Sequence, residues 1–265
     1  MTTAELLDAL WRDYTAITPQ AARIHARFAE RGEVIANDHV ALRTYDRVGE
    51  GRFTLGRRFE ALGWVRQGDY RFPDKHLIAS HWRHPEPGLP KVFVSELVVG
   101  ELPAPAAAIV ERLIAALPPG FVDRADLPWA GRPWPVSHAD YRALLEVSEY
   151  AAWVAAFGFR VNHFTVDVNR LRTFADLAEV NAFVRGAGFA LNQVGGAIKG
   201  TPADHLEQSS TTAEPIEVEF SDGRFAVPSC YYEFARRYPL PDGSLFQGFV
   251  PTSADKLFHS TDARR

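Results

Sequence analysis

Two histidines and one glutamate have the residue types that a metal site needs. His39 lies in NDHVALRTYD and His163 in RVNHFTVDV, where apolar and polar residues alternate as in a strand. Glu233 lies among aromatic residues in CYYEFARR. A neutral imidazole binds iron, zinc or copper, and a buried carboxylate is costly unless it meets a cation. Two histidines and one carboxylate are the ligands of non-haem Fe(II) oxygenases, which leave further positions open.

Each of these residues also has an ordinary structural interpretation. A histidine on a strand can bond to a backbone carbonyl, and Glu233 can pair with Arg236 or Arg237 at the end of its strand. The three residues are far apart in the chain, so their spacing alone does not separate a metal site from three unrelated roles. The metal interpretation requires the fold to bring them together.

Arg43 is the first candidate for binding a substrate. It lies four residues after His39, so both side chains point to the same face of one strand, about 13 Å apart. A guanidinium beside a metal site can bind a substrate carboxylate through two parallel hydrogen bonds. The structural alternative is an ion pair with Asp38 or Asp46.

Glu96 and Tyr231 are candidates to contact the metal ligands. Glu96, in KVFVSELVV, shares a strand face with Val94 and Val98, and we expect it to point inward as a partner of the ligands or a fourth ligand. Tyr231 shares the face of Glu233. Three more histidines surround a further strand and are the alternative place for a metal: His76, His81 and His84.

The order of the expected elements repeats along the chain. After two N-terminal helices, the first unit (about 34–99) has a strand, a helix and three strands, and a helical insert (about 100–158) follows. The second unit (about 159–240) again begins with a strand and a helix and continues in strands. The strands are expected at 37–46, 64–72, 76–84, 91–99, 160–168, 189–194, 205–213, 215–221 and 229–238. The helices are expected at 53–62, 104–117, 137–157 and 173–188.

This repeat predicts the fold class. Two β-α-β-β-β units can pair into one curved mixed sheet whose concave side holds a site, with additional helices around it. His39 and His163 lie on the strands that open the two units, and Glu96 and Glu233 lie on the strands that close them. We therefore expect an α+β protein with a single domain over 1–265.

Composition limits the functions that the chain can have. Its 265 residues carry a formal net charge of −4, with 46% hydrophobic and 23% charged residues, as in ordinary globular proteins. The mild acidity argues against a nucleic-acid partner, and no stretch approaches the ~20 apolar residues that span a membrane. With no signal peptide recognised, we expect a cytoplasmic protein. The oligomeric state stays open.

Cysteine usage narrows the possible metal chemistry. The chain has one cysteine and nine histidines, so neither an internal disulfide nor a thiolate zinc site can form. Histidines and carboxylates must then hold any metal. No GxSxG and no HExxH motif is present, which leaves serine-hydrolase and zincin chemistry without support.

Several segments together resemble the DUF1338 family. They are NDHVALRTYD, KVFVSEL, VNHFTVDVN and PSCYYEFARR, followed by LFQGFVPTSADKLFHST. The family includes bacterial 2-oxoadipate dioxygenase/decarboxylases, also called hydroxyglutarate synthases, which act in lysine catabolism. The resemblance implies a vicinal-oxygen-chelate-like fold, with Fe(II) bound by His39, His163 and Glu233 and a substrate gripped by Arg43. It also implies the conversion of 2-oxoadipate and O2 to D-2-hydroxyglutarate and CO2.

The resemblance leaves the choice of substrate open, because this chain is considerably shorter than the family enzymes. The leading hypothesis is a dioxygenase/decarboxylase whose partners are a small 2-oxo dicarboxylic acid and O2. A metal-dependent isomerase or lyase of the same fold is the second hypothesis, and a metal-free binding protein is the third. The presence of all three ligands and Arg43 disfavours the third, because a binding protein needs no open metal site.

Overall fold

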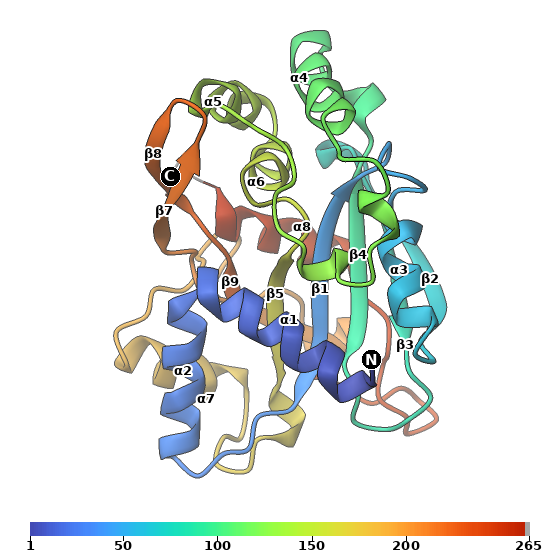
Figure 1. Ribbon diagram of the computed structural model, residues 1–265. Helices are drawn as coiled ribbons and strands as arrows, with labels where there is room; N and C mark the ends of the chain where they lie inside the picture. Colours follow the sequence, from blue (N-terminus) through green and yellow to red (C-terminus); the bar gives the residue numbers. More distant parts are fainter. Residues whose placement is uncertain (263–265) are drawn as a thin grey trace.

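A seven-stranded mixed sheet forms the centre of the computed structural model, which describes residues 1–262 (Figure 1). The strand order is β2-β3-β4-β1-β5-β9-β6. These strands are β1 (Asn37–Tyr45), β2 (Val65–Phe72), β3 (Leu77–Arg83), β4 (Lys91–Leu97), β5 (Val161–Asp167), β6 (Leu206–Ser210) and β9 (Tyr231–Arg237). A separate hairpin contains β7 (Pro215–Phe220) and β8 (Gly223–Pro228).

Eight α-helices surround the sheet within the described residues. They are α1 (Thr3–Ile17), α2 (Pro19–Glu30), α3 (Arg52–Glu60), α4 (Ala104–Ala115), α5 (His138–Val147), α6 (Glu149–Phe157), α7 (Leu177–Gly186) and α8 (Pro251–Leu257). None of the helices in this part of the chain is long and apolar enough to cross a membrane.

The predicted repeat is confirmed at the centre of the sheet. In the first unit the opening strand β1 is a parallel neighbour of the closing strand β4, and in the second β5 is a parallel neighbour of β9. The two opening strands, β1 and β5, are antiparallel neighbours, so one sheet continues through both units. The single-domain bounds stay a prediction, and positions 263–265 lie outside the described residues.

The outer part of the second unit departs from the prediction. Residues 189–194 form no strand and make one isolated bridge, from Leu191 to Thr211. The segment runs into Gly195 and Gly196, whose φ angles of 70° and 95° turn the chain away from an extended course. The predicted strand 215–221 pairs with β8 in the separate hairpin and does not join the main sheet.

Two helix predictions also change. The helix expected at 137–157 is broken at Ser148, whose extended backbone ends α5 and whose hydroxyl accepts a hydrogen bond from the Ala151 amide to begin α6. The helix expected at 173–188 begins only at Leu177, after Asp176 caps it through the Glu179 amide. Helix α8 near the C-terminus was not predicted.

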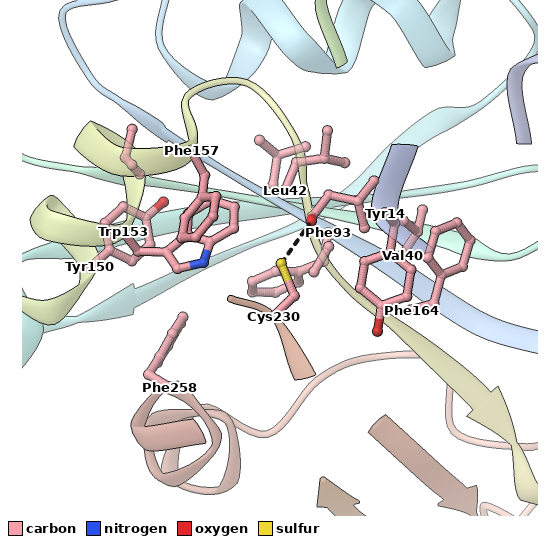
Figure 2. Close-up of a cluster of buried hydrophobic side chains, with 14 of the residues drawn as sticks. Tyr14, Val40, Leu42, Phe93, Tyr150, Trp153, Phe157, Phe164, Cys230 and Phe258 are labelled. Atoms are coloured by element: carbon pink, nitrogen blue, oxygen red, sulfur yellow. Dashed lines mark hydrogen bonds between the residues drawn. The ribbon is translucent and has the colours of Figure 1, made fainter. Parts of the chain in front are cut away.

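Helices cover both faces of the sheet. Phe164 of β5 packs against Trp11 and Tyr14 of α1, with ring centroids 5.0 and 5.2 Å apart, and α3 and α7 lie on the same face. We call this the helical face. The opposite face, the site face, contacts α6 and α8. Figure 2 shows side chains from both faces of the core, including Phe164 with Tyr14 and Trp153 with Tyr150. Strand alternation thus sends neighbouring residues into two different packed layers.

Candidate metal centre

The central strands bring His39, His163 and Glu233 together on the site face. Thr165 of β5 lies opposite His39 of β1 on one side and opposite Glu233 of β9 on the other. His39 Nε2 is 3.5 Å from Glu233 Oε1, and His163 Nε2 is 3.4 Å from Glu233 Oε2. The three ligand atoms all lie within 4.8 Å of one another. Within residues 1–262 this is the group that could hold a metal ion.

Each ligand is oriented by one further side chain. Asp38 Oδ1 lies 2.8 Å from His39 Nδ1, and Asn162 Oδ1 lies 3.1 Å from His163 Nδ1. Because each oxygen accepts a hydrogen bond from Nδ1, Nε2 carries the lone pair that can bind a metal. In His39 this nitrogen lies 3.0 Å from the Thr165 hydroxyl, which can donate to it until a metal takes that place. Gln208 Nε2 donates to Glu233 Oε1 over 2.6 Å. These contacts fix the direction in which all three ligands point.

The electrostatics of the group fit a divalent cation. Burial lowers the pKa of both His39 and His163, which keeps their rings neutral and able to bind a metal at pH 7. Burial raises the pKa of Glu233 to about 8, although the hydrogen bond from Gln208 acts in the opposite direction. Glu233 Oε2 is fully buried and has no hydrogen-bond partner. A metal would satisfy this oxygen and compensate the buried charge.

Asp38 stays charged because cations surround it. Arg237 donates from Nε and Nη2 to the two Asp38 oxygens, at 2.6 and 2.9 Å, and Lys91 Nζ lies 3.6 Å away. Burial alone would raise the pKa of Asp38, but Arg237 and Lys91 hold it well below its usual value. The carboxylate therefore acts on His39 as a full negative charge, which strengthens the imidazole as a ligand.

Arg43 lies in the same cavity as the three ligands, as its position on β1 predicts. Its side chain is buried, and Nη1 donates to Glu149 Oε2 of α6 over 3.2 Å. The predicted alternatives, Asp38 and Asp46, are not its partners. Aromatic rings surround the guanidinium, with ring centroids at 4.8 Å for Tyr150 and 5.4 Å for Phe258. Arg43 Nη2 is buried without a hydrogen-bond partner, so it can receive an acceptor from a ligand.

The cavity between Arg43 and the ligands has a volume of about 30 Å³. Phe93 and Phe249 form walls near His39, and helix α8 with the residue after it covers the opening. A small acid can enter only when part of this cover moves, because the volume holds little more than one water molecule. Its lining residues include Ala41, Leu42, Ser95, Tyr231, Ala254, Leu257 and Phe258.

Glu96 does not contact the metal ligands, and this expectation was wrong. Its side chain lies on the helical face, where it accepts a hydrogen bond from the Arg52 amide over 2.6 Å and pairs with the Arg52 guanidinium. The alternation within β4 is as expected, but Phe93 and Ser95 face the cavity instead. Because both faces of the sheet are buried, an inward position did not identify the site face.

Tyr231 does lie against a ligand. Its ring stacks on that of His163, with centroids 4.5 Å apart and an angle of 23° between the planes.

The alternative histidines, His76, His81 and His84, do not come together into a metal site. His76 pairs with Glu101, His81 Nδ1 lies 2.9 Å from the Tyr70 hydroxyl, and His84 lies 3.2 Å from the Leu62 carbonyl.

The side chains that orient the three candidate ligands were not predicted from the sequence. A signal was present for two of them, because an Asx residue directly precedes each histidine ligand: Asp38 before His39 and Asn162 before His163. No local signal identifies Gln208, which reaches Glu233 from 25 residues away. Glu149 is 106 residues from Arg43, so sequence gave no indication of that pair either.

Comparisons with known proteins identify the family of this chain. The family model for 2-oxoadipate dioxygenase/decarboxylase matches residues 2–119 and 121–245. The chain belongs to this family. The chloroplastic/amyloplastic 2-oxoadipate dioxygenase/decarboxylase of Oryza sativa subsp. japonica is 33% identical over 256 residues, which cover 87% of this chain and 70% of the relative.

Solved structures show the same relationship. A hydroxyglutarate synthase from Oryza sativa in complex with 2-oxoadipate has 31% identity and a TM-score of 0.93, and the match covers 98% of this chain and 92% of that one. A structure from Shewanella frigidimarina has 46% identity and a TM-score of 0.89, with 94% and 97% coverage.

A more distant structure confirms the predicted fold class. A glyoxalase superfamily protein from Ralstonia eutropha has 22% identity and a TM-score of 0.77, and the match covers 92% of this chain and 84% of that one. At this identity the likeness concerns the fold alone. It supports the vicinal-oxygen-chelate-like arrangement of the two paired units around one sheet.

Metal binding is expected to require His39, His163 and Glu233 together. Replacing any one of them by Ala should weaken binding more than about 100-fold, because two remaining ligands hold a divalent ion poorly. Metal content after dialysis, measured by mass spectrometry, checks this. His81→Ala is the matched control, since His81 is also a buried histidine of the site face. Full occupancy in all three ligand variants would place the metal elsewhere.

In the metal-free protein, the contribution of Glu233 to stability is expected to fall as pH rises from about 4.5 to about 8. The folded state holds the proton of Glu233 up to a pKa of about 8, whereas the unfolded chain releases it near 4.5. At Glu233 the folded state thus binds more protons than the unfolded chain in this window, so the contribution of this residue to the free energy of unfolding falls with pH. The lowered pKa values of His39 and His163 act in the opposite direction. Urea denaturation in the presence of a metal chelator, at pH 5, 6.5 and 8, measures the free energy of unfolding.

The variant Glu233→Gln isolates this effect because it cannot titrate. Its stability relative to the unsubstituted protein should rise steadily over the same pH range. Glu217→Gln, at an exposed position, is the control and should show no such trend. A constant difference between Glu233→Gln and the unsubstituted protein at all three pH values would contradict the prediction.

Proposed function

We propose that the protein is an Fe(II)-dependent dioxygenase/decarboxylase that acts on a 2-oxo dicarboxylic acid, with 2-oxoadipate as the first candidate. One observation carries the proposal: a buried His–His–Glu group and a buried arginine with an unpaired Nη2 line the same cavity. The names of the rice relative and of the rice structure with 2-oxoadipate support the choice of substrate.

The protein's own residues bind and orient the acid. Arg43 Nη2 is the free donor for one carboxylate of the substrate, while Nη1 stays with Glu149. The aromatic rings of Tyr150, Trp153 and Phe258 hold the guanidinium in place, since their centroids lie 4.8 to 5.4 Å from Arg43 Cζ. The fixed guanidinium of Arg43 can therefore select dicarboxylic acids by the length of the chain between their carboxylates.

The reaction is balanced without any further reductant. 2-Oxoadipate and O2 yield 2-hydroxyglutarate and CO2, and both oxygen atoms of O2 end in the products. A ferrous ion held by His39, His163 and Glu233 would supply the redox chemistry with O2, which a d10 zinc ion cannot supply. The apolar walls formed by Phe93 and Phe249 exclude water from the cavity during turnover.

The setting of the reaction in the cell also stays a proposal. We propose a cytoplasmic protein whose partners are the 2-oxo acid and O2, with no nucleic acid and no membrane. The net charge of −4 supports the view that nucleic acid is not a partner. A role in lysine catabolism follows from the proposed substrate.

Oxygen consumption tests the proposed reaction. Protein loaded with Fe(II) is given a series of 2-oxo acids in an oxygen electrode, and CO2 is measured in parallel. One CO2 should appear for each O2 consumed, and zinc-loaded protein should be inactive. Turnover of the same acids by zinc-loaded protein under argon would instead identify a metal-dependent isomerase or lyase.

Arg43 is expected to determine the preference for a dicarboxylate. Arg43→Lys and Arg43→Ala should weaken substrate binding by about 2–4 kcal/mol, or roughly 30- to 1000-fold. Alanine removes the charge, and a lysine ammonium lacks the planar donors that bind Glu149 through Nη1 and a substrate carboxylate through Nη2. If Arg43 binds the far carboxylate, Arg43→Ala should also lose the preference for a dicarboxylate over the matching monocarboxylic 2-oxo acid. Steady-state kinetics with both acids measure this.

The exposed Arg47 provides the matched control for this experiment. Arg47 comes shortly after the same strand and pairs with Glu111 at the surface. The variant Arg47→Lys should therefore leave kcat and KM unchanged for both acids. Metal content should be normal in every Arg43 variant. Equal weakening for both acids would place Arg43 at the carboxylate beside the keto group, and unchanged kinetics would make its role structural.

A further inference from the structure

The segment Phe246–Phe249, which we call the strap, passes over the metal cavity between β9 and α8. Phe249 faces the ligands: its ring centroid is 4.9 Å from that of His39 and 4.8 Å from that of Phe93. Few backbone bonds hold the strap. The Phe246 amide donates to the Tyr238 carbonyl over 3.1 Å, and the Phe249 amide donates to the Tyr70 hydroxyl over 3.2 Å.

The other side of the strap is not packed against the core. Gln247 of the strap and the preceding Leu245 line a second, polar cavity of about 240 Å³, and its lining also includes Lys91 and Asp38. The strap therefore separates two spaces, a small one around the metal ligands and a larger one behind them. A thin wall between two cavities needs a specific contact to keep it in place.

Arg237 provides this contact. Its Nη1 donates to the carbonyls of Phe246 and Gly248, over 2.9 and 2.8 Å. Its Nε and Nη2 donate to Asp38, which in turn accepts from His39 Nδ1 over 2.8 Å. The guanidinium is buried and lies 5.4 Å from the ring centroid of Phe249. One side chain thus joins the strap to the carboxylate that orients a metal ligand.

We propose that Arg237 is a positioning residue that couples closure of the strap to the orientation of His39. When the strap opens, Arg237 loses two carbonyl acceptors and Asp38 loses a fixed partner, so His39 is held less firmly toward the metal. The open state consequently binds metal more weakly than the closed state. The proposal rests on the metal site of the proposed function but not on the identity of the substrate.

Thermodynamic linkage makes this coupling measurable without turnover. If the closed state binds metal more tightly by some factor, metal must favour the closed strap by the same factor. Amide hydrogen exchange at Phe246 and Phe249 reports opening of the strap, because both amides donate hydrogen bonds that opening breaks. Metal should therefore slow exchange at these two positions, and the slowing should depend on Arg237.

The experiment measures amide exchange with and without Zn²⁺, which is redox-inert. In the unsubstituted protein Zn²⁺ should slow exchange of Phe246 and Phe249 by about tenfold, within the usual range of coupling between two sites. In Arg237→Met the slowing should fall below about twofold. Arg236→Met is the matched control, because Arg236 directly precedes Arg237 on β9 but donates to the Ala175 carbonyl. It should keep the tenfold effect.

Arg237→Lys keeps the test decisive if Arg237→Met does not fold. The lysine retains a charge for Asp38, but its single nitrogen cannot reach Asp38 and both strap carbonyls together, so the coupling should again be lost. Full coupling in either folded variant would overturn the proposal. Absence of metal binding by the unsubstituted protein would overturn the metal site and the coupling together. Intact coupling without O2 consumption would overturn only the proposed reaction.

Discussion

The antiparallel pairing of β1 with β5 brings His39 and His163 to one place on the sheet, next to Glu233 of β9. In this register Ala41 lies opposite His163, and His39 lies opposite Thr165, which in turn faces Glu233 of β9. Because side chains alternate along a strand, a shift of one residue would send the histidine of one strand to the helical face. Packing of Phe164 against α1 opposes such a shift, since it would expose this ring to the site face.

Two buried ion pairs lie on either side of the ligands, and both connect distant parts of the chain. Arg237 and Asp38 are 199 residues apart, and Arg43 and Glu149 are 106 residues apart. Buried pairs contribute little net stability because removing two charges from water costs about as much as their attraction returns. Their effect here is orientation: one pair fixes His39, and the other leaves a single guanidinium nitrogen of Arg43 free.

The C-terminal part of the described chain completes the site that the two repeated units begin. The strap places Phe249 against His39, and α8 covers the cavity. Thr261, beyond α8, donates to Glu149 Oε2 over 2.8 Å, the same oxygen that accepts from Arg43. Both ion pairs thus contact this last segment, so its closure acts on the metal side and on the substrate side of the cavity.

The three candidate ligands, the strands that carry them and the order of the two units could be predicted from the residues alone. In the segments around His39, His163 and Glu233, apolar and polar residues alternate with a period of two. This alternation is a local property of a strand and does not depend on distant parts of the chain. The same alternation could not decide which buried face holds the site. Glu96 therefore lies against α3, because both faces of this sheet are covered by helices. Glu149, Gln208 and Arg237 could not be predicted in this way, since contacts between distant segments depend on how the strands and helices pack together.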